Sequence, residues 1–392
     1  MYIIQNNLME GTVMETTKTN GKALKRTFWG TAAFYLIIGF EFLYMASPFA
    51  VYFYSVYAPV LNFFNDNTTL SWLNSFFLPH VVRSTSSTFI NGLTIVGAFL
   101  AITGFLAFLV GACQVYYSTL RKKGAVTGGI YNIVRHPQYI SFMICSLGLL
   151  IMWPRFIGAI MFVTMVFAYY LLAKVEEREC SVKFGQSYID YKNKTNMFLP
   201  FRIPLVARLH LPRARGKKVL VLITTYFISL IAILGIASGL QTMSINSLHS
   251  TYTSNNVNIS INEMTEENIN TIMAIVQSDS YVISILTEHD DNAMYINYIL
   301  PTTWFAAEIP MNDLERGRGH ASPRNFDPNY FKAIITRVNL RDSDDVNVSN
   351  LLTNVHTLEP VIEVWVSISE QRVTHILDIP DGIYDGIPVA IF

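Results

Sequence analysis

Long hydrophobic runs alternate with short polar segments over the first 240 residues of the chain. The runs at 28–58, 88–117 and 219–240 are each long enough to cross a bilayer, which takes about 20 helical residues. A fourth run, from Ile140 to Ala173, is broken only by Trp153-Pro154-Arg155. Proline ends a helix because it lacks a backbone N–H, so this run is expected to form two helices, 138–153 and 155–174. The pattern predicts an all-α membrane domain of about five transmembrane helices.

The pattern changes after residue 240, where polar and apolar residues alternate over short stretches. Residues 257–261 alternate in the manner of a strand, and Thr265 is expected to cap a helix that runs to about Ser278. A long loop is expected over 311–328. Further strands are predicted at 281–286, 293–299, 331–338, 361–368 and 373–377. The chain is therefore expected to continue into a separate soluble α+β domain.

Composition and charge support this division. The sequence is 51% hydrophobic and 14% charged, which is typical of membrane proteins. Its formal net charge of zero conceals a net charge of +13 in residues 1–240 and of −13 in residues 241–392. We expect an N-terminal lead (1–26), a membrane domain (27–240) and an acidic domain (241–392). The three cysteines all precede the acidic domain, so no disulfide framework is expected there.

The basic residues also predict an orientation. They cluster at 18–26, 121–123 and 202–218 and are sparse at 59–87. Positively charged loops remain on the cytosolic side, so we expect a cytosolic N-terminus and an extracytoplasmic acidic domain. A protein partner for the acidic domain is considered, and no nucleic-acid partner is predicted.

Polar motifs flank the broken hydrophobic run. Arg135-His136-Pro137-Gln138-Tyr139 precedes it, and Glu176-Glu177 follows it. A tight helical hairpin returns the chain to the side it left, so the two motifs are expected to meet at one membrane face. Beyond them, Phe184, Tyr188 and Tyr191 recur at i, i+4 and i+7, which predicts one face of a short interfacial helix.

The ordered motifs resemble those of isoprenylcysteine carboxyl methyltransferases and phospholipid methyltransferases, a superfamily of integral-membrane enzymes. The resemblance covers about residues 128–202. Ile130 stands where the family usually has proline, and Ser141 where it often has glycine, which affects local backbone geometry. The resemblance is carried by Gly129-x-Tyr131, Arg135-His136-Pro137-x-Tyr139, Glu176-Glu177, Phe184-Gly185-x-x-Tyr188-x-x-Tyr191 and Pro200.

The resemblance implies S-adenosylmethionine as methyl donor, bound at the cytosolic face, and a lipid or lipophilic acceptor such as a prenylcysteine carboxylate or a phospholipid amine. Arg135 and Glu177 are implied as catalytic. Carboxylates can accept hydrogen bonds from the donor's ribose or ammonium, arginine or histidine can hold its carboxylate, and tyrosine faces favour a nearby cation. The residues implied in cofactor binding are Tyr131, Arg135, His136, Pro137, Tyr139, Glu176, Glu177, Tyr188 and Tyr191.

Other candidate residues leave alternatives open. Glu41 lies within the first predicted span, where a carboxylate is costly; it serves substrate or proton transfer, or it faces a neighbouring helix. His136 is a general base or shapes the donor pocket. The acidic segment Asp342-Ser343-Asp344-Asp345 is a solvated surface or a cation site, although it lacks the spacing of a calcium loop. No zinc-ligand spacing is present, so no metal site is predicted.

Two other functions remain. Glu179-Cys180-x-x-Lys183-Phe184-Gly185 is similar to the corresponding segment of membrane sterol reductases, which use NADPH, although those proteins carry more spans before it. Alternatively, the chain is a non-enzymatic membrane-anchored binding protein. No Gly-x-Gly-x-x-Gly follows a predicted strand, which disfavours a soluble Rossmann-type methyltransferase.

Overall fold

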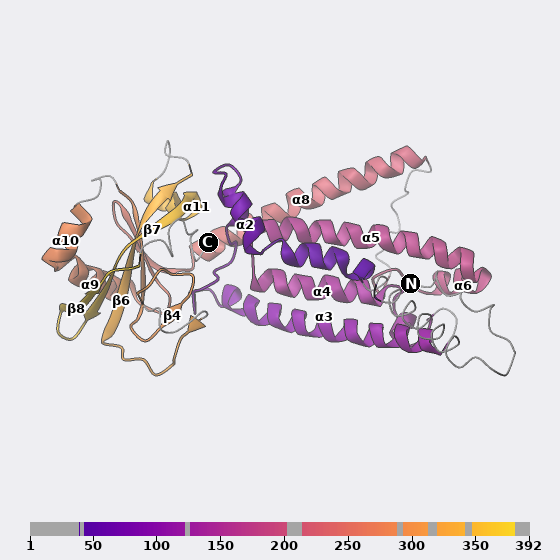
Figure 1. The fold of residues 1–392 in the computed structure, drawn as a ribbon, viewed down its shortest axis with the longest axis horizontal. Helices are drawn as coiled ribbons and strands as arrows, with labels where there is room; N and C mark the ends of the chain where they lie inside the picture. Colours follow the sequence, from indigo (N-terminus) through magenta and orange to yellow (C-terminus); the bar gives the residue numbers. More distant parts are fainter. Residues whose placement is uncertain are drawn as a thin grey trace, which may run out of the picture. The chain divides into compact units, whose positions relative to one another are not determined.

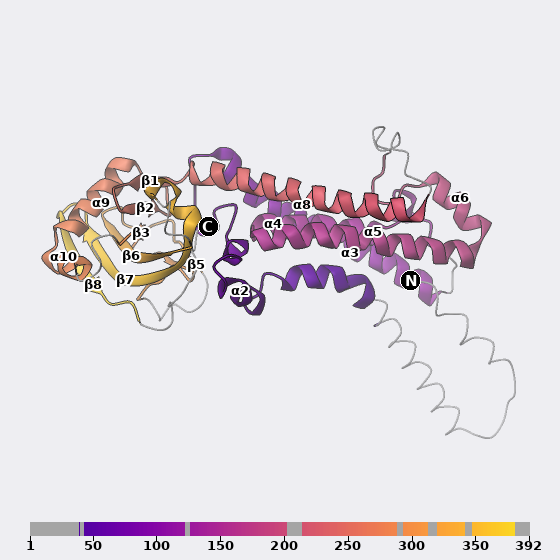
Figure 2. The same cartoon turned by 90° about the horizontal axis from the view of Figure 1, so that it is seen from above.

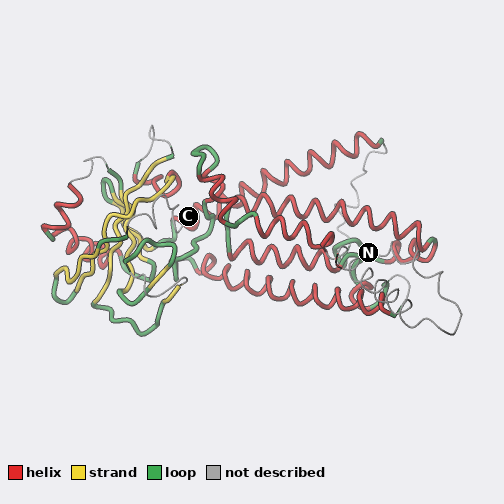
Figure 3. Tube along the Cα trace, viewed as in Figure 1, coloured by secondary structure: helices red, strands yellow, loops and turns green. Residues whose placement is uncertain are grey.

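The computed structural model describes residue 39 and residues 43–121, 126–201, 214–287, 293–312, 320–341 and 347–380. The chain divides into two compact units. The helical unit comprises Met1–Ser55, Ala98–Leu149 and Ile160–Ile231. The sheet unit comprises Val56–Gly97, Leu150–Ala159 and Ala232–Phe392. Figure 3 distinguishes the helices of the first from the strands of the second.

The membrane-type helices are α3 (Thr88–Leu120), α4 (Pro137–Met152), α5 (Phe156–Phe184) and α8 (Arg215–Ile245) (Figure 1). By length and composition, α3, α5 and α8 can each cross a membrane, and α4 is a shorter apolar helix. The prediction of five spans is therefore met only in part. Much of the first predicted span lies outside the described residues, which include a helix over 43–54 followed by α2 (Ala58–Asn65).

Aromatic side chains join the helices of the helical unit. The Phe142 ring of α4 stacks on Phe49 and Phe108, with ring centroids 4.7 and 4.1 Å apart. Phe108 lies on α3, and Phe49 lies on the helix over 43–54. The Tyr169 hydroxyl of α5 donates to the Met45 carbonyl oxygen at 3.2 Å. The Phe142 contacts join α4 to α3 and to the helix over 43–54, and the Tyr169 hydrogen bond joins α5 to that same helix.

The sheet unit contains a six-stranded mixed sheet in the order β1-β2-β3-β6-β7-β8. Only β2 and β3 pair in parallel among these neighbours. Central strand β3 sends Ile296, Tyr298 and Leu300 into one hydrophobic core, and Tyr295 and Ile299 into the core to which α9 contributes. Figure 2 shows α9 beside the sheet. The strands are β1 (His249–Tyr252), β2 (Asn256–Ser260), β3 (Tyr295–Pro301), β6 (Tyr330–Leu340), β7 (Val355–Ser367) and β8 (Arg372–Leu377).

Short elements complete the unit. Two helices, α9 (Glu266–Ser278) and α10 (Ser280–Thr287), follow β2. A two-stranded ribbon is formed by β4 (Phe305–Ala306) and β5 (His320–Ala321). The remaining elements are the helix α11 (Leu351–Asn354) and the 3-10 helices η1 (Ser71–Asn74), η2 (Gly129–Asn132) and η4 (Val348–Asn350).

Most of the predicted elements of the sheet unit are confirmed. β2, β3, β6, β7 and β8 fall on predicted strands, although β7 begins earlier than predicted. Thr265 caps α9, since its side chain accepts a hydrogen bond from the Asn268 backbone N–H at 3.3 Å. The predicted loop at 311–328 contains strand β5.

The strand predicted at 281–286 is wrong, because these residues form α10. The Asp279 carboxylate accepts hydrogen bonds from the backbone N–H groups of Tyr281 and Val282, which stabilises a helix start. Within α10 only Val282 is buried, so the β-branched residues around it do not pack as a strand would. Local capping decides the structure of this short apolar stretch.

Candidate active site

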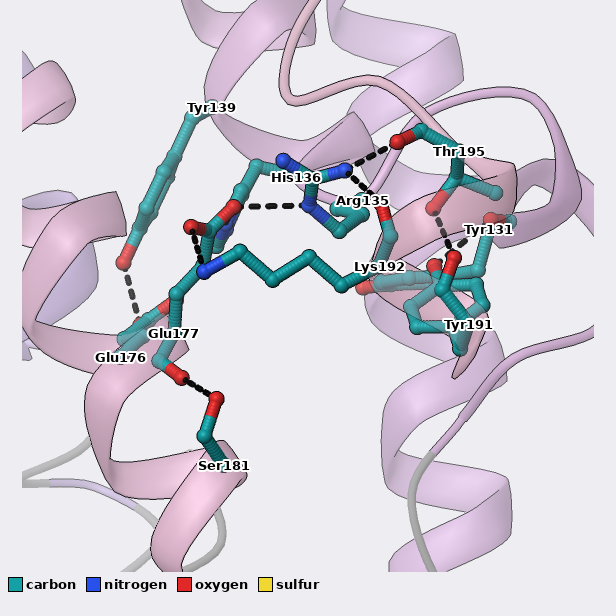
Figure 4. Close-up of polar contacts among 10 residues, drawn as sticks. All are labelled: Tyr131, Arg135, His136, Tyr139, Glu176, Glu177, Ser181, Tyr191, Lys192 and Thr195. Carbon is teal, nitrogen blue, oxygen red and sulfur yellow. Dashed lines mark hydrogen bonds and ion pairs between the residues drawn. The ribbon is translucent and has the colours of Figure 1, made fainter. Parts of the chain in front are cut away.

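The α4–α5 hairpin brings the two polar motifs together, as predicted (Figure 4). The Tyr139 hydroxyl, in the first turn of α4, donates to Glu176 Oε1 on α5. His136 Nδ1 lies 3.3 Å from Glu176 Oε2. Pro137 is the first residue of α4, a position that suits a residue without a backbone N–H. The turn at residues 153–155 thus places the basic motif against the acidic pair.

Glu177 is buried, with 1% of its side chain exposed, and it is paired with two cations. Its Oε1 lies 2.7 Å from Arg135 Nε, and its Oε2 lies 2.9 Å from Lys192 Nζ. The Ser181 hydroxyl donates to the Glu177 carbonyl oxygen at 2.6 Å. A buried carboxylate is stable only when it is paired in this way. Glu177 therefore joins the basic motif to α6 (Gln186–Lys194).

Arg135 makes further hydrogen bonds to the end of α6. Its Nη1 donates to the carbonyl oxygens of Lys192, at 2.9 Å, and Thr195. The backbone N–H groups of Arg135 and His136 donate to the carbonyl oxygens of Asn196 and Met197 at 2.9 and 3.2 Å. These contacts fasten the segment after α6 to the motif and fix the guanidinium in one orientation.

The tyrosines of α6 complete the site. Tyr188 is buried, and the Tyr191 hydroxyl donates to the Tyr131 carbonyl oxygen at 2.7 Å. Burial is the main cause that raises the pKa of Tyr191 to about 12, so it remains a neutral donor. The prediction that Phe184 shares their helix is wrong: Phe184 ends α5, and Gly185, with a φ of 57°, turns the chain before α6 begins.

Most of these residues surround a recess. It provides about 80 Å³, room for a few water molecules, so a larger ligand must displace side chains of its wall. Glu176 lines the recess, whereas Glu177 is not among its lining residues and is paired with Arg135. Within the described part of the chain, His136 Nε2 and Gln138 Nε2 are buried without a hydrogen-bond partner. The lining residues are Val115, Val126, Tyr131, Arg135, His136, Gln138, Tyr139, Glu176, Cys180, Tyr188 and Tyr191.

His136 lies between two carboxylates. Burial by itself lowers the pKa of His136, but the contacts with Glu176 and Glu177 outweigh burial and raise the pKa above its ordinary value. The ring also stacks parallel to Tyr139, with centroids 5.5 Å apart. The two carboxylates thus favour the protonated imidazole, which disfavours a role of His136 as a general base.

The site residues predicted from the sequence did not include two residues that the structure places at the site. Lys192 and Gln138 were not singled out, although both stand within the quoted motif region. No spacing rule pairs Lys192 with Glu177, and only the turn at Gly185 brings them together. Glu41 lies outside the described residues.

Comparison with known proteins identifies the motif region. Residues 87–187 match the family model of phospholipid methyltransferases. The chain is 35% identical over 77 residues to protein-S-isoprenylcysteine O-methyltransferase B of Arabidopsis thaliana, covering 19% of this chain and 39% of that protein. It is 34% identical over 82 residues to the protein-S-isoprenylcysteine O-methyltransferase of Schizosaccharomyces pombe, covering 21% and 33%.

A third relative is the probable O-methyltransferase ustE of Ustilaginoidea virens, 34% identical over 94 residues, covering 21% of this chain and 33% of that protein. The chain thus spans 33 to 39% of the length of these relatives. No solved structure matches the chain. The predicted resemblance to the isoprenylcysteine and phospholipid methyltransferase superfamily is confirmed for this region.

Proposed function

We propose, from the match of residues 87–187 to the phospholipid methyltransferase family, that the protein transfers a methyl group from S-adenosylmethionine to a lipophilic acceptor. The observation that carries the proposal is the recess where Arg135, His136, Tyr139 and Glu176 meet. It presents both cationic and anionic groups beside buried tyrosines. S-adenosylmethionine, which supplies an electrophilic methyl group on a sulfonium, carries a carboxylate, an ammonium and a ribose that need such partners.

The side chains of the recess divide into supporting and binding groups. Arg135 and Glu177 largely satisfy one another, so Glu177 orients Arg135 and stays out of contact with the ligand. Among the described residues that line the recess, His136 Nε2, which lies 3.7 Å from Glu177 Oε1, and Gln138 Nε2 have no hydrogen-bond partner, and they suit the donor's carboxylate. Glu176 Oε1 and Oε2 suit its ammonium or ribose hydroxyls. Holding donor and acceptor in line, away from water, is the main catalytic requirement of methyl transfer.

The charge state of His136 favours an acceptor that needs no base. An amine must lose a proton when it is methylated, whereas a carboxylate accepts the methyl cation and becomes a neutral ester. Contacts with Glu176 and Glu177 raise the pKa of His136 and favour its protonated form, which cannot accept a further proton. We therefore assign a lipophilic carboxylate, such as a prenylcysteine, as the acceptor class ahead of a phospholipid amine.

The site belongs on the cytosolic side in this proposal. The basic clusters at 18–26, 121–123 and 202–218 support a cytosolic N-terminus and an extracytoplasmic acidic domain. The acceptor would enter from the bilayer among the apolar helices. A protein partner for the acidic domain remains a prediction.

Calorimetric titration of the detergent-purified protein tests donor binding. We expect S-adenosylmethionine and its demethylated product each to bind at one equivalent, and NADPH not to bind. Glu176→Gln is expected to weaken the binding of both ligands. Asp190→Asn removes an exposed carboxylate of α6 that does not line the recess, and it is expected to leave both affinities unchanged. Binding of NADPH alone would support a reductase, and binding of none would support a membrane-anchored binding protein.

Radiolabelled donor then identifies the acceptor. The protein in lipid nanodiscs is offered a farnesylated cysteine with a free carboxylate, its amide, or phosphatidylethanolamine. We expect incorporation of label only into the acceptor with the free carboxylate. Mild alkali should then release the label as methanol, because a methyl ester hydrolyses and an N-methyl group does not. Alkali-stable label in phosphatidylethanolamine would contradict the carboxylate assignment.

A further inference from the structure

A second histidine–carboxylate cluster lies in the sheet unit and shares no residue with the site described above. His80 comes from the segment before α3, Glu308 follows β4, and His320 begins β5. Their side chains each direct one ligand atom to a common point, with all three atoms within 4.8 Å of one another. We propose that this cluster binds a Zn²⁺ ion and leaves one coordination position open. The ligands are His80, Glu308 and His320.

The separations suit shared coordination better than direct hydrogen bonds. His320 Nε2 lies 3.3 Å from Glu308 Oε1, and His80 Nε2 lies 3.6 Å from the same oxygen. A good N–H···O hydrogen bond spans about 2.7–3.2 Å. Two ligands on a tetrahedral zinc, with bonds of about 2.0–2.2 Å, lie about 3.3–3.6 Å apart. A zinc ion therefore fits with small movements of the side chains.

The chain holds each ligand in place. The Ala306–His320 pair of the β4–β5 ribbon keeps His320 close to Glu308, two residues past Ala306. The Trp304 indole N–H donates to the Pro323 carbonyl oxygen at 3.0 Å and closes the same ribbon. These bonds position the carboxylate and one imidazole independently of any metal ion.

His80 is held by its own neighbours. Its imidazole stacks on the Phe76 ring, with centroids 4.6 Å apart and planes 17° from parallel. Phe76 is fixed in turn, since its carbonyl oxygen accepts a hydrogen bond from Gln241 Nε2 at 2.9 Å and Arg155 lies over its ring. Further along the segment, the Arg83 backbone N–H donates to the Ile261 carbonyl oxygen at 2.8 Å. The segment therefore presents His80 to the ribbon in one orientation.

An unmatched atom points to a missing ligand. Glu308 Oε2 is buried and has no hydrogen-bond partner among the residues that the structure describes. A carboxylate oxygen left in this state is costly, and a cation shared by both oxygens satisfies it. Two imidazoles and one carboxylate form a donor set that suits zinc, whereas Ca²⁺ and Mg²⁺ prefer oxygen ligands alone.

All three proposed ligands line a recess of about 560 Å³. Apolar side chains make up much of the remaining wall, among them Val82, Ile95, Trp153 and Phe305. Zinc sites with three protein ligands keep a fourth position for water or another small ligand. The recess gives such a ligand access to the ion.

Zinc binding to the full-length protein tests the proposal. The protein carries an affinity tag without histidine, is dialysed against EDTA and then against chelator-free buffer, and is titrated with Zn²⁺ in detergent. We expect one equivalent to bind, with Co²⁺ giving the visible spectrum of a tetrahedral site and excess Mg²⁺ not competing. Glu308→Gln and His320→Gln are each expected to weaken zinc binding at least about tenfold.

His375→Gln serves as the matched control, because it removes an exposed imidazole of the same unit and is expected to bind zinc normally. Unfolding temperatures of the zinc-free variants establish that each has folded. The proposal is overturned if the wild type takes up no zinc at one equivalent, or if both ligand variants bind as the wild type does. Donor binding at the helical unit is measured on the same samples and does not depend on the result.

Discussion

The helical unit and the sheet unit each contain a cluster in which histidine meets glutamate, and the two clusters differ in their cations. In the helical unit, Glu177 forms ion pairs with Arg135 and Lys192, and His136 contacts Glu176. In the sheet unit, Glu308 faces two imidazoles and one of its oxygens has no partner in the described part of the chain. In the first cluster Glu177 is paired with cations of the chain itself, whereas in the second one oxygen of Glu308 has no partner among the described residues and is available to a metal ion.

The largest effect is expected from Glu177→Gln. This change leaves Arg135 and Lys192 without their buried anion, and breaking a buried ion pair costs about 3–5 kcal/mol. Donor affinity is expected to fall at least about 100-fold, since Arg135 loses its orientation. Calorimetry measures the affinity, and thermal unfolding measures the stability. If donor binding is retained, Glu177 does not organise the site.

Glu176→Gln sharpens the distinction between the two glutamates. Glu176 lines the recess and accepts from Tyr139, so its loss is expected to lower donor affinity about tenfold. The fall in unfolding temperature is expected to be smaller than for Glu177→Gln. Equal destabilisation by the two variants would contradict the assignment of one to support and the other to binding.

Removal of metal should affect only the sheet unit. At a Zn²⁺ concentration 100 times the Kd, binding stabilises the folded state by about 2.7 kcal/mol. EDTA is therefore expected to lower the unfolding temperature of the wild type by several degrees and to leave Glu308→Gln unchanged. Scanning calorimetry of the full-length protein measures both. An equal response to EDTA in the wild type and Glu308→Gln would show that another site binds the metal.

The histidine of the first cluster should give a pH-dependent stability. Contacts with Glu176 and Glu177 raise the pKa of His136, so its stabilising contribution is fully present below the unfolded pKa of about 6.5. That contribution is lost as pH rises through the folded pKa. The difference in unfolding temperature between the wild type and His136→Gln is therefore expected to shrink as pH rises from 6 towards 9. A difference that grows with pH would mean that His136 is neutral in the folded protein.

The smallest effect concerns the turn that carries Lys192 to Glu177. Gly185 has a φ of 57° and a ψ of −135°, a sparsely populated conformation that costs other residues about 1–3 kcal/mol. Apart from its chain neighbours, no described residue lies within 4 Å of the position that an alanine Cβ would take. Gly185→Ala is expected to destabilise the protein by about 1 kcal/mol. Gly128→Ala is the control, since Gly128 has the same open surroundings but a φ of −102°. Equal unfolding temperatures for the two variants would show that the turn relaxes without cost.

The sequence by itself determined the broken hydrophobic run, the polar motifs at its two ends and most strands of the sheet. These follow from local rules: the length of an apolar run, the proline at 154, and the alternation of side chains along a strand. The helical hairpin then requires Arg135 and Glu177 to approach one another. Local rules failed at residues 281–286, where Asp279 stabilises a helix start that the apolar pattern does not reveal.

Only the tertiary structure decided how the charges are shared. The two adjacent glutamates look equivalent in the sequence, yet the rotation of successive residues on α5 turns Glu176 to the recess and Glu177 to Arg135 and Lys192. His80 and His320 come from segments far apart in the chain, so no ligand spacing could predict that they converge on Glu308. Coordination and ion pairing depend on distances of a few ångströms, and those distances arise only when distant segments pack.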